Sequence, residues 1–282
     1  MPIREISADA IKDAVRGLIL EAEFNIPDDV RASVLCHYER EETELGRFAL
    51  GQILLNQTMA REERAPMCQD TGMIIIFADV GQDAHINGGF EDAIQDGARE
   101  AYRDGYLRAS IVSDPLFDRR NTSDNSPAII HTRIITGDRI HLLAMPKGFG
   151  SENMSALAML TPADGEDGVR RFIIDTVRHA GGNPCPPIVV GVGIGGSMES
   201  CALLAKRACA RPLNQRNPDA RYAKLEGECL TLINGLGIGA AGFGGNATAL
   251  AVNIEYAPTH IAGLPVAVNI CCHACRHASL TL

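Results

Sequence analysis

Several features that would place a chain in a common class are missing from this sequence of 282 residues. Lysine and arginine form no basic patch, and the formal net charge is −9, which argues against nucleic-acid binding. No apolar run is long enough to cross a bilayer, since the longest, Ile188 to Ile194, has the length of a strand. The first residues, Met1 to Ile6, lack the apolar segment of a secretion signal. We therefore expect a cytoplasmic protein that binds neither nucleic acid nor a membrane.

Internal repeats, low-complexity tracts and linkers are also absent. Apolar residues make up 46% of the chain, enough for a sizeable core. We predict one domain over residues 1–282 of mixed α/β (α+β) class, with a helical portion over about 1–62 and mixed-sheet lobes over about 63–282. The helical portion begins with an apolar stripe at helical spacing, formed by Ile11, Val15, Leu18 and Ile19.

The pattern after residue 62 predicts alternating strands and helices. Strands are expected over 72–80, 128–136, 139–145, 188–194, 249–256 and 266–270. Helices are expected over 90–103, 168–179, 198–211 and 219–234. Gly137-Asp138 is a tight-turn pair, so we expect 128–136 and 139–145 to form a hairpin.

The nine cysteines do not complete a zinc knuckle, because Cys272-x-x-Cys275 has no second cysteine pair nearby. Four lie at apolar positions of helical patterns and are predicted to be packed thiols: Cys36, Cys201, Cys209 and Cys229. Three others, Cys68, Cys185 and Cys272, lie far apart in glycine- and proline-rich or cysteine-rich contexts. Three thiolates with no obvious fourth suit an iron–sulfur cluster that leaves one iron open for substrate.

The segment around Cys68 is dense in functional side chains. Beside a metal bound by Cys68, the amide of Gln69 and the carboxylate of Asp70 could position a substrate or move a proton. The alternative is a turn capped by Asp70. Prolines stiffen the loop around Cys185, which suits a ligand, although a buried free cysteine beside a proline turn is the alternative.

Three further features leave alternatives open. Gly191 to Gly196 departs from the dinucleotide fingerprint, and we interpret it as exposed N–H groups that approach an anion or a cluster, with close packing of strand and helix as the alternative. Cys271 to Cys275 could be half a zinc site or contain a redox pair. Glu39 to Glu42 is predicted to be a solvated face.

Two single residues are candidates for the site. Arg108 could clamp a carboxylate bidentately, and a surface arginine is the alternative. His260, in Pro-Thr-His, could be catalytic, or a histidine of a loop or the core.

Together, several ordered motifs resemble the class I, iron–sulfur fumarate hydratase family, which includes the L-tartrate dehydratases. The resemblance extends from about Glu39 to Thr281. The motifs that carry it are Pro-Met-Cys-Gln-Asp-Thr-Gly (66–72), Lys-Gly-Phe-Gly-Ser-Glu-Asn (147–153), Asn-Pro-Cys-Pro-Pro with Val-Gly-Val-Gly-Ile-Gly-Gly (183–196), Leu-Ala-Lys-Arg-Ala (204–208), Leu-Gly-Ile-Gly-Ala-Ala-Gly-Phe-Gly-Gly (236–245), Pro-Thr-His (258–260), Pro-Val-Ala (265–267) and Arg-His-Ala (276–278).

The resemblance implies a cofactor and a set of site residues. It implies a 4Fe-4S cluster, bound by the portion over about 63–282, whose ligands are Cys68, Cys185 and Cys272. Cys272 is preferred over Cys271 and Cys275 because it matches the family's spacing to Pro265 and to Arg276-His277. The resemblance also implies substrate-binding residues, Gln69, Arg108 and Gly150 of the loop 148–150, and catalytic residues, Asp70 and His260. Phe149 stands where the family commonly has glycine.

The resemblance also implies a partner. Family members carry a smaller C-terminal domain with the catalytic base, and this sequence has no counterpart to it. We therefore expect an α subunit whose β subunit carries that domain, assembled as a dimer of αβ pairs.

The expected reaction is the reversible hydration of fumarate to L-malate, a small dicarboxylate, by an oxygen-sensitive enzyme. Residues 150–153 and 194–196 look more like the fumarate branch. The alternatives are an L-tartrate dehydratase α subunit and a non-catalytic, metal-stapled scaffold subunit.

Overall fold

The computed structural model describes residues 4–282. Met1 to Ile3, the first part of the stretch in which we expect no secretion signal, lie outside the described residues. The chain divides into two compact units. Unit 1 comprises residues 4–27, Gln57–Phe149 and Arg276–Leu282, and unit 2 comprises Asp28–Asn56 and Gly150–Cys275. Each unit contains helices and a four-stranded sheet, so the mixed α/β class predicted from the sequence is confirmed. The single domain over 1–282 stays a prediction.

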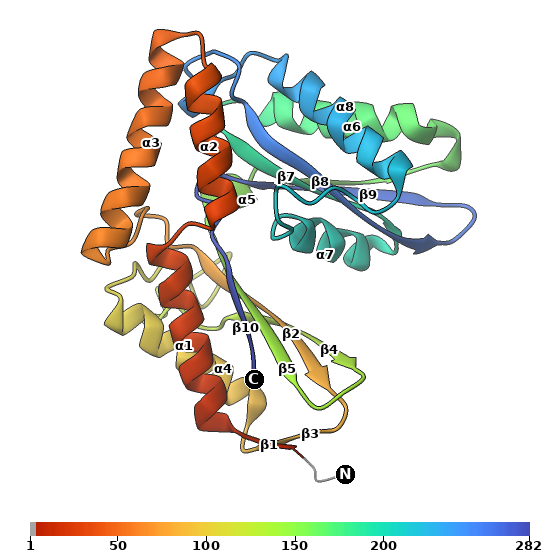
Figure 1. The fold of residues 1–282 in the computed structure, drawn as a ribbon. Helices are drawn as coiled ribbons and strands as arrows, with labels where there is room; N and C mark the ends of the chain where they lie inside the picture. Colours follow the sequence, from red (N-terminus) through yellow and green to blue (C-terminus); the bar gives the residue numbers. More distant parts are fainter. Residues whose placement is uncertain (1–3) are drawn as a thin grey trace. The chain divides into compact units, whose positions relative to one another are not determined.

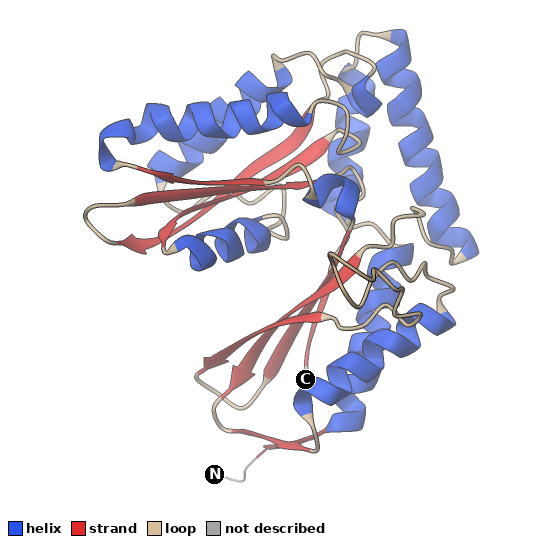
Figure 2. Cartoon of the chain, turned by 180° about the vertical axis from the view of Figure 1, so that it is seen from behind, coloured by secondary structure: helices blue, strands red, loops and turns tan. Residues whose placement is uncertain are grey.

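Unit 1 is built on a sheet with the strand order β10-β5-β2-β4. Helices α1 (Ala8–Phe24) and α4 (Phe90–Asp104) stack on one face of this sheet (Figures 1 and 2). A short parallel pair, β1 and β3, adds to the unit. The elements are β1 (Arg4–Ser7), α1 (Ala8–Phe24), β2 (Met73–Gly81), β3 (Ala84–Asn87), α4 (Phe90–Asp104), β4 (Ile129–Ile135), β5 (Ile140–Lys147) and β10 (Ala278–Thr281).

Helix α1 follows the predicted apolar stripe. The side chain of Ser7 caps its first turn by accepting the backbone N–H of Ala10 at 3.1 Å. All four predicted stripe residues are buried in the core of unit 1, where the helix packs against α4 and the sheet. The helical period alone was enough to identify this face.

The predicted hairpin between 128–136 and 139–145 is wrong. Strands β4 and β5 both exist, but β2 lies between them, parallel to β4 and antiparallel to β5. The backbone N–H of Gly81, the last residue of β2, donates to the carbonyl of Arg139 at 2.8 Å, and that of Gln82, the next residue, donates to the carbonyl of Ile135 at 2.9 Å. The turn at Gly137 therefore wraps around the end of a buried central strand instead of pairing its own flanks.

Unit 2 is built on a sheet with the strand order β6-β9-β7-β8. Helices α6 and α8 cover one face, and α7 covers the other (Figure 1). The elements wholly in unit 2 are α2 (Asp28–Arg40), β6 (Ala156–Leu160), η1 (Pro162–Asp164), α6 (Gly165–Ala180), β7 (Ile188–Gly196), α7 (Met198–Ala208), α8 (Ala220–Asn234), η2 (Ala240–Gly242), β8 (Ala249–Thr259) and β9 (Leu264–Cys271). Two helices cross the boundary, α3 (Glu44–Glu63) and α5 (Phe149–Glu152). Among residues 4–282, none of the helices combines the length and the apolar character needed to cross a membrane.

Residues 191–194 do not expose the N–H groups that we expected to approach an anion or a cluster, so the preferred interpretation is wrong for this part of β7; for Gly195 and Gly196 it stays a prediction. Strand β7 pairs with β8 on one side and with β9 on the other, which occupies its backbone. A Cβ at Gly191 would lie 2.6 Å from the Sγ of Cys209, and a Cβ at Gly193 would overlap the carbonyl of Cys201 in α7. Close packing of helix on strand, the alternative, explains these glycines.

The charged run Glu39 to Glu42 is only partly a solvated face. Glu41 is buried, and its carboxylate accepts the backbone N–H of Thr43 at 3.0 Å and that of Asn246 at 2.9 Å. A cluster of charged residues suggests exposure to solvent, but the sequence does not show that a backbone N–H 205 residues away needs an acceptor.

Close packing at β7 gives a first prediction. Gly193→Ala should lower the free energy of unfolding by roughly 2–3 kcal/mol, because the added methyl group meets the backbone of α7. A matched control is Gly227→Ala in α8, where a Cβ meets nothing within 4 Å. That change should raise stability by about 0.5–1 kcal/mol through helix propensity. Urea denaturation of the two variants tests this, and equal stabilities would contradict the packing argument.

Candidate functional site

The loop that carries Cys68 fixes Asp70 beside it. The backbone N–H of Asp70 lies 3.4 Å from the Sγ of Cys68, to which it donates. The carboxylate of Asp70 accepts the backbone N–H of Phe149 at 2.8 Å. A Cβ at Gly148 would lie 3.1 Å from the same carboxylate oxygen, so the absence of a side chain there lets the two segments approach closely. Cys68 and Asp70 are half-buried, and Gln69 between them is exposed.

Buried polar groups hold the end of this loop. The hydroxyl of Tyr102 lies 2.9 Å from the carbonyl oxygens of both Thr71 and Gly72, and the side-chain amide of Asn125 donates to the carbonyl of Gly72 at 3.0 Å. Tyr102 and Asn125 come from distant parts of the sequence and were not predicted as site residues. Their signal is burial of a polar side chain, which a sequence pattern does not reveal.

A buried ion pair lies beneath the same loop. Glu23 is fully buried and Arg276 is 2% exposed, with 3.4 Å between Nε of Arg276 and Oε2 of Glu23. Arg276 also donates to the main-chain carbonyl of Asp70. Burial raises the pKa of Glu23 to about 7; the Arg276 charge opposes this rise, and the Asp70 charge adds to it. Sequence reasoning noted Arg276 only within a family motif and missed Glu23.

Arg108 lies at the surface of unit 1. Its side chain is exposed, and its carbonyl oxygen accepts the hydroxyl of Thr71 at 3.0 Å. Asn125 Oδ1 accepts the N–H groups of Ser110 and Ile111 at 2.7 and 3.1 Å. The backbone around Arg108 is therefore tied to the Cys68 loop, while the guanidinium group faces solvent.

Within unit 2, the structure brings the segments of Cys185 and Cys272 together. The backbone N–H of His273 donates to the carbonyl of Cys185 at 3.2 Å. The two segments meet because Cys271, the last residue of β9, pairs with Val189 near the start of β7. Cys185 itself has a left-handed backbone, with φ of 53°, which is uncommon for a residue with a side chain. Its side chain is exposed.

Burial sorts the nine cysteines into three groups, of which the exposed group contains Cys185 alone. Five are buried: Cys201, Cys209, Cys229, Cys271 and Cys275. Cys68 and Cys272 are half-buried, and so is Cys36, which was predicted to be packed. Burial raises the pKa of Cys229 to about 12, as expected of a packed thiol. Beside Cys272, the thiol of Cys275 donates to the carbonyl of Cys209 at 3.3 Å.

Two segments that carry family motifs, one with Glu152 and one with Lys206, contact each other and the end of β9. Glu152 forms an ion pair with Lys206 of α7, and its other carboxylate oxygen accepts the side-chain amide of Asn269 at 3.0 Å. The hydroxyl of Ser155 accepts that amide and the backbone N–H of Ile270, both at 3.1 Å. These bonds fix the part of β9 that leads into Cys272.

His260 and Gly150 lie elsewhere in unit 2. His260 is exposed in the turn between β8 and β9, where Nδ1 accepts the N–H of Ala262 at 3.2 Å. Strand β9 runs from this turn to Cys271, about 24 Å away at the usual rise per residue. The structure therefore does not bring His260 to Cys185 and Cys272 within unit 2. Gly150 is exposed in α5, with nothing within 4 Å of an added Cβ.

The donor set fits a cluster in chemistry. Cys68, Cys185 and Cys272 offer thiols at or near the surface, and Cys68 receives a backbone N–H of the kind that tunes cluster sulfurs. Cys68 belongs to unit 1, and the other two belong to unit 2. Within the described part of the chain, no three His, Cys, Asp or Glu side chains are grouped so that they could hold a metal ion.

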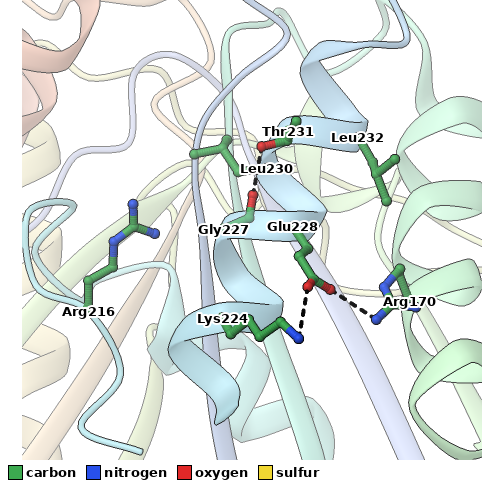
Figure 3. A pocket seen from close by; sticks show the side chains of 8 residues that line it. All are labelled: Arg170, Arg216, Lys224, Gly227, Glu228, Leu230, Thr231 and Leu232. Atoms are coloured by element: carbon green, nitrogen blue, oxygen red, sulfur yellow. Dashed lines mark hydrogen bonds and ion pairs between the residues drawn. The ribbon is translucent and has the colours of Figure 1, made fainter. Parts of the chain in front are cut away.

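One cleft of unit 2 does not contain these residues. It has a volume of 890 Å³ and lies along α8 in unit 2 (Figure 3). Glu228 at its centre pairs with Arg170 at 3.0 Å and with Lys224 at 3.5 Å, as the dashed lines show. Its lining includes neither a cysteine nor a predicted site residue. The cleft is therefore not our candidate site.

Protonation of Glu23 gives a second prediction. Between its ordinary pKa of 4.5 and its folded pKa of about 7, Glu23 is protonated in the folded chain and ionised in the unfolded chain. The free energy of unfolding of the wild type, relative to Glu23→Gln, should therefore fall by roughly 3 kcal/mol as pH rises through this range. The charged or titratable neighbours are Arg276, Asp70 and Tyr102.

Urea denaturation of the two proteins from pH 5 to pH 8 measures this difference. Most of the fall should occur below pH 7, and the difference should then level off. A difference that is constant over the whole range would show that Glu23 titrates as an ordinary surface carboxyl.

Comparison with known proteins places the whole chain. The family model described as fumarate hydratase (Fumerase) matches residues 12–281. A protein of Methanocaldococcus jannaschii, named "Putative L(+)-tartrate dehydratase subunit alpha", is 42% identical over 273 residues, which cover 95% of this chain and 96% of that protein. The L(+)-tartrate dehydratase subunit alpha of Escherichia coli K12 is 31% identical over 281 residues, which cover 98% of this chain and 92% of that protein. The chain therefore belongs to the fumarate hydratase (Fumerase) family.

Proposed function

We propose that the chain is the α subunit of an iron–sulfur hydro-lyase that hydrates fumarate reversibly to L-malate. One observation carries this proposal. Of the three cysteines in the family motifs, Cys185 is exposed, and Cys68 and Cys272 are half-buried. Cys271 and Cys275, the alternative ligands beside Cys272, are buried. Ligands that must receive a metal group need accessible thiols.

The residues of this chain have separate roles in the proposed reaction. A 4Fe-4S cluster held by Cys68, Cys185 and Cys272 would supply a Lewis-acidic iron with an open position for substrate oxygen. Asp70, fixed by the N–H of Phe149, would hold or move a proton at the substrate hydroxyl. The exposed side chains of Gln69 and Arg108 would bind and orient a substrate carboxylate. The β subunit would supply the base for the carbon-bound proton.

L(+)-tartrate is the second candidate substrate. The names of both relatives favour it, while the family description and residues 150–153 and 194–196 favour fumarate. The two reactions are the same elimination of water, and tartrate has one more hydroxyl group. The roles proposed for Asp70 and Arg108 apply to either dicarboxylate.

Anaerobic reconstitution tests the proposed ligands. The chain should bind a 4Fe-4S cluster, and Cys272→Ser should lose it, because two thiolates hold a cluster poorly. Cys275→Ser is the matched control three residues away, and it should keep the cluster since Cys275 is a buried thiol. Iron and sulfide content and the EPR spectrum, with and without fumarate, are the measurements.

A spectrum that changes on adding dicarboxylate would support an iron open to substrate. Bound zinc, or a cluster that ignores dicarboxylate and survives Cys272→Ser, would favour the non-catalytic scaffold subunit instead.

Co-expression with the β subunit tests the enzyme and its substrate. The isolated chain should show little or no turnover, and the αβ assembly should convert fumarate with a higher kcat/KM than L(+)-tartrate. The opposite preference would make the chain a tartrate dehydratase subunit. Full turnover by the isolated chain would contradict the need for a partner.

A further inference from the structure

The segment from Met67 to Asp70 is anchored at both ends by two buried residues. At one end, the backbone N–H of Met67 donates to the main-chain carbonyl of Glu23 at 3.2 Å. At the other end, the guanidinium of Arg276 donates to the main-chain carbonyl of Asp70. Cys68 and Gln69 lie between these two anchors. The two anchoring residues form an ion pair with each other.

Glu23 and Arg276 come from opposite ends of the sequence. Glu23 lies in the last turn of α1, and Arg276 lies two residues before β10. Both belong to unit 1, as does the segment they hold. Arg276 also follows Cys272 by four residues in the sequence. The segment from Cys272 to Arg276 thus carries one proposed cluster ligand, Cys272, and the residue that anchors the loop of a second ligand, Cys68.

A buried ion pair needs a reason, since apolar side chains of similar volume often stabilise a core as well or better. Here, Arg276 provides something that an apolar residue cannot. Its planar fork bonds the carbonyl of Asp70 while its Nε faces Glu23. Glu23 is the acidic side chain that faces Arg276 in a site closed to water.

The result is that residue 70 is fixed on both sides. Arg276 holds its carbonyl, and the N–H of Phe149 holds its carboxylate at 2.8 Å. The N–H of Asp70 is then left directed at Cys68, 3.4 Å from Sγ. Loss of either anchor would free the backbone that sets the distance between thiol and carboxylate.

We propose that Glu23 and Arg276 are positioning residues that hold Cys68 and Asp70 in one geometry. The inference rests on the proposed function for the roles of the thiol and the carboxylate. The anchoring itself concerns the backbone of this chain and can be measured without iron, substrate or partner.

Hydrogen exchange at single amides of the full-length chain, prepared without iron, is the direct test. The reporters are the N–H groups of Met67, Asp70 and Phe149, and the N–H of Gly81, bonded to Arg139 at 2.8 Å, is the internal reference. Arg276→Lys keeps the positive charge beside Glu23 but removes the second guanidinium nitrogen, which donates to the carbonyl of Asp70. Exchange at Asp70 and Phe149 should rise about tenfold, with a smaller rise at Met67 and none at Gly81.

A matched control is a second ion pair of unit 1. Asp79→Asn breaks the pair with Arg133, whose nitrogen lies 2.7 Å from the Asp79 carboxylate, and it should leave all three reporters unchanged. The double variant Glu23→Gln/Arg276→Met removes both charges together. It guards against a variant that fails to fold, and its melting temperature should stay near that of the wild type while the reporters still exchange faster.

Unchanged exchange at Asp70 and Phe149 in both Arg276 variants, with the fold intact, would overturn the proposal. Equal acceleration at Gly81 would also overturn it, because the pair would then stabilise the unit as a whole. Reconstitution separates this result from the function. If the wild type binds a cluster, Arg276→Lys should bind less iron and show an altered EPR spectrum. If the wild type binds none, the proposed function fails while the exchange result stands.

Discussion

The candidate site depends on how closely the backbone at Gly72 passes the end of β5. Gly72 has φ of 73°, and a Cβ there would overlap the carbonyl of Lys147. The contact brings the Cys68 loop against Gly148 and Phe149, so that Asp70 can accept the N–H of Phe149. A side chain at position 72 would push these two segments apart. The glycine of the Cys-Gln-Asp-Thr-Gly motif is therefore a steric requirement for the geometry around Asp70.

Unit 2 meets a related constraint by sheet pairing. The antiparallel pairing of β7 and β9 places the start of one strand beside the end of the other. Cys185 precedes the first and Cys272 follows the second, so two segments 87 positions apart come within one hydrogen bond of each other. The glycines of β7 contribute indirectly. They let α7 pack on one face of the sheet, while β8 and β9 pair with the two edges of β7. Backbone packing thus orders the Cys68 loop of unit 1 and the Cys185 and Cys272 segments of unit 2 without a metal.

Sequence patterns predicted what is local and failed where partners are distant. The apolar period of α1 and the element types around the sheets were readable because neighbouring residues determine them. The Gly137 turn was also recognised, but a turn does not show that β2 will be inserted between its flanks. The charges at Glu39 to Glu42 suggested exposure to solvent, yet Glu41 accepts the backbone N–H of Asn246 in a remote loop.

The layer beneath the site was invisible for the same reason. Tyr102 and Asn125 bond to carbonyls that are 30 and 53 positions away, and Arg276 bonds to one that is 206 positions away. Buried polar groups need partners, but a sequence does not say which ones they find. The motif around Cys68 pointed to the chemistry, while the residues that hold it in place required the structure.

The charge balance of unit 1 bears on the proposed second subunit. An acidic chain that receives a dicarboxylate must offer cations at the site against its own net charge of −9. Two cations near the Cys68 loop are buried and engaged within the chain. Arg276 binds Glu23 and the Asp70 carbonyl, and Lys147 donates to the carbonyl of Gly148 at 3.4 Å. Arg108 is exposed, and one guanidinium matches one carboxylate. A substrate with two carboxylates calls for a second cation. Arg64, exposed four residues before Cys68, is one source within the chain, and the β subunit of the proposed assembly would be another.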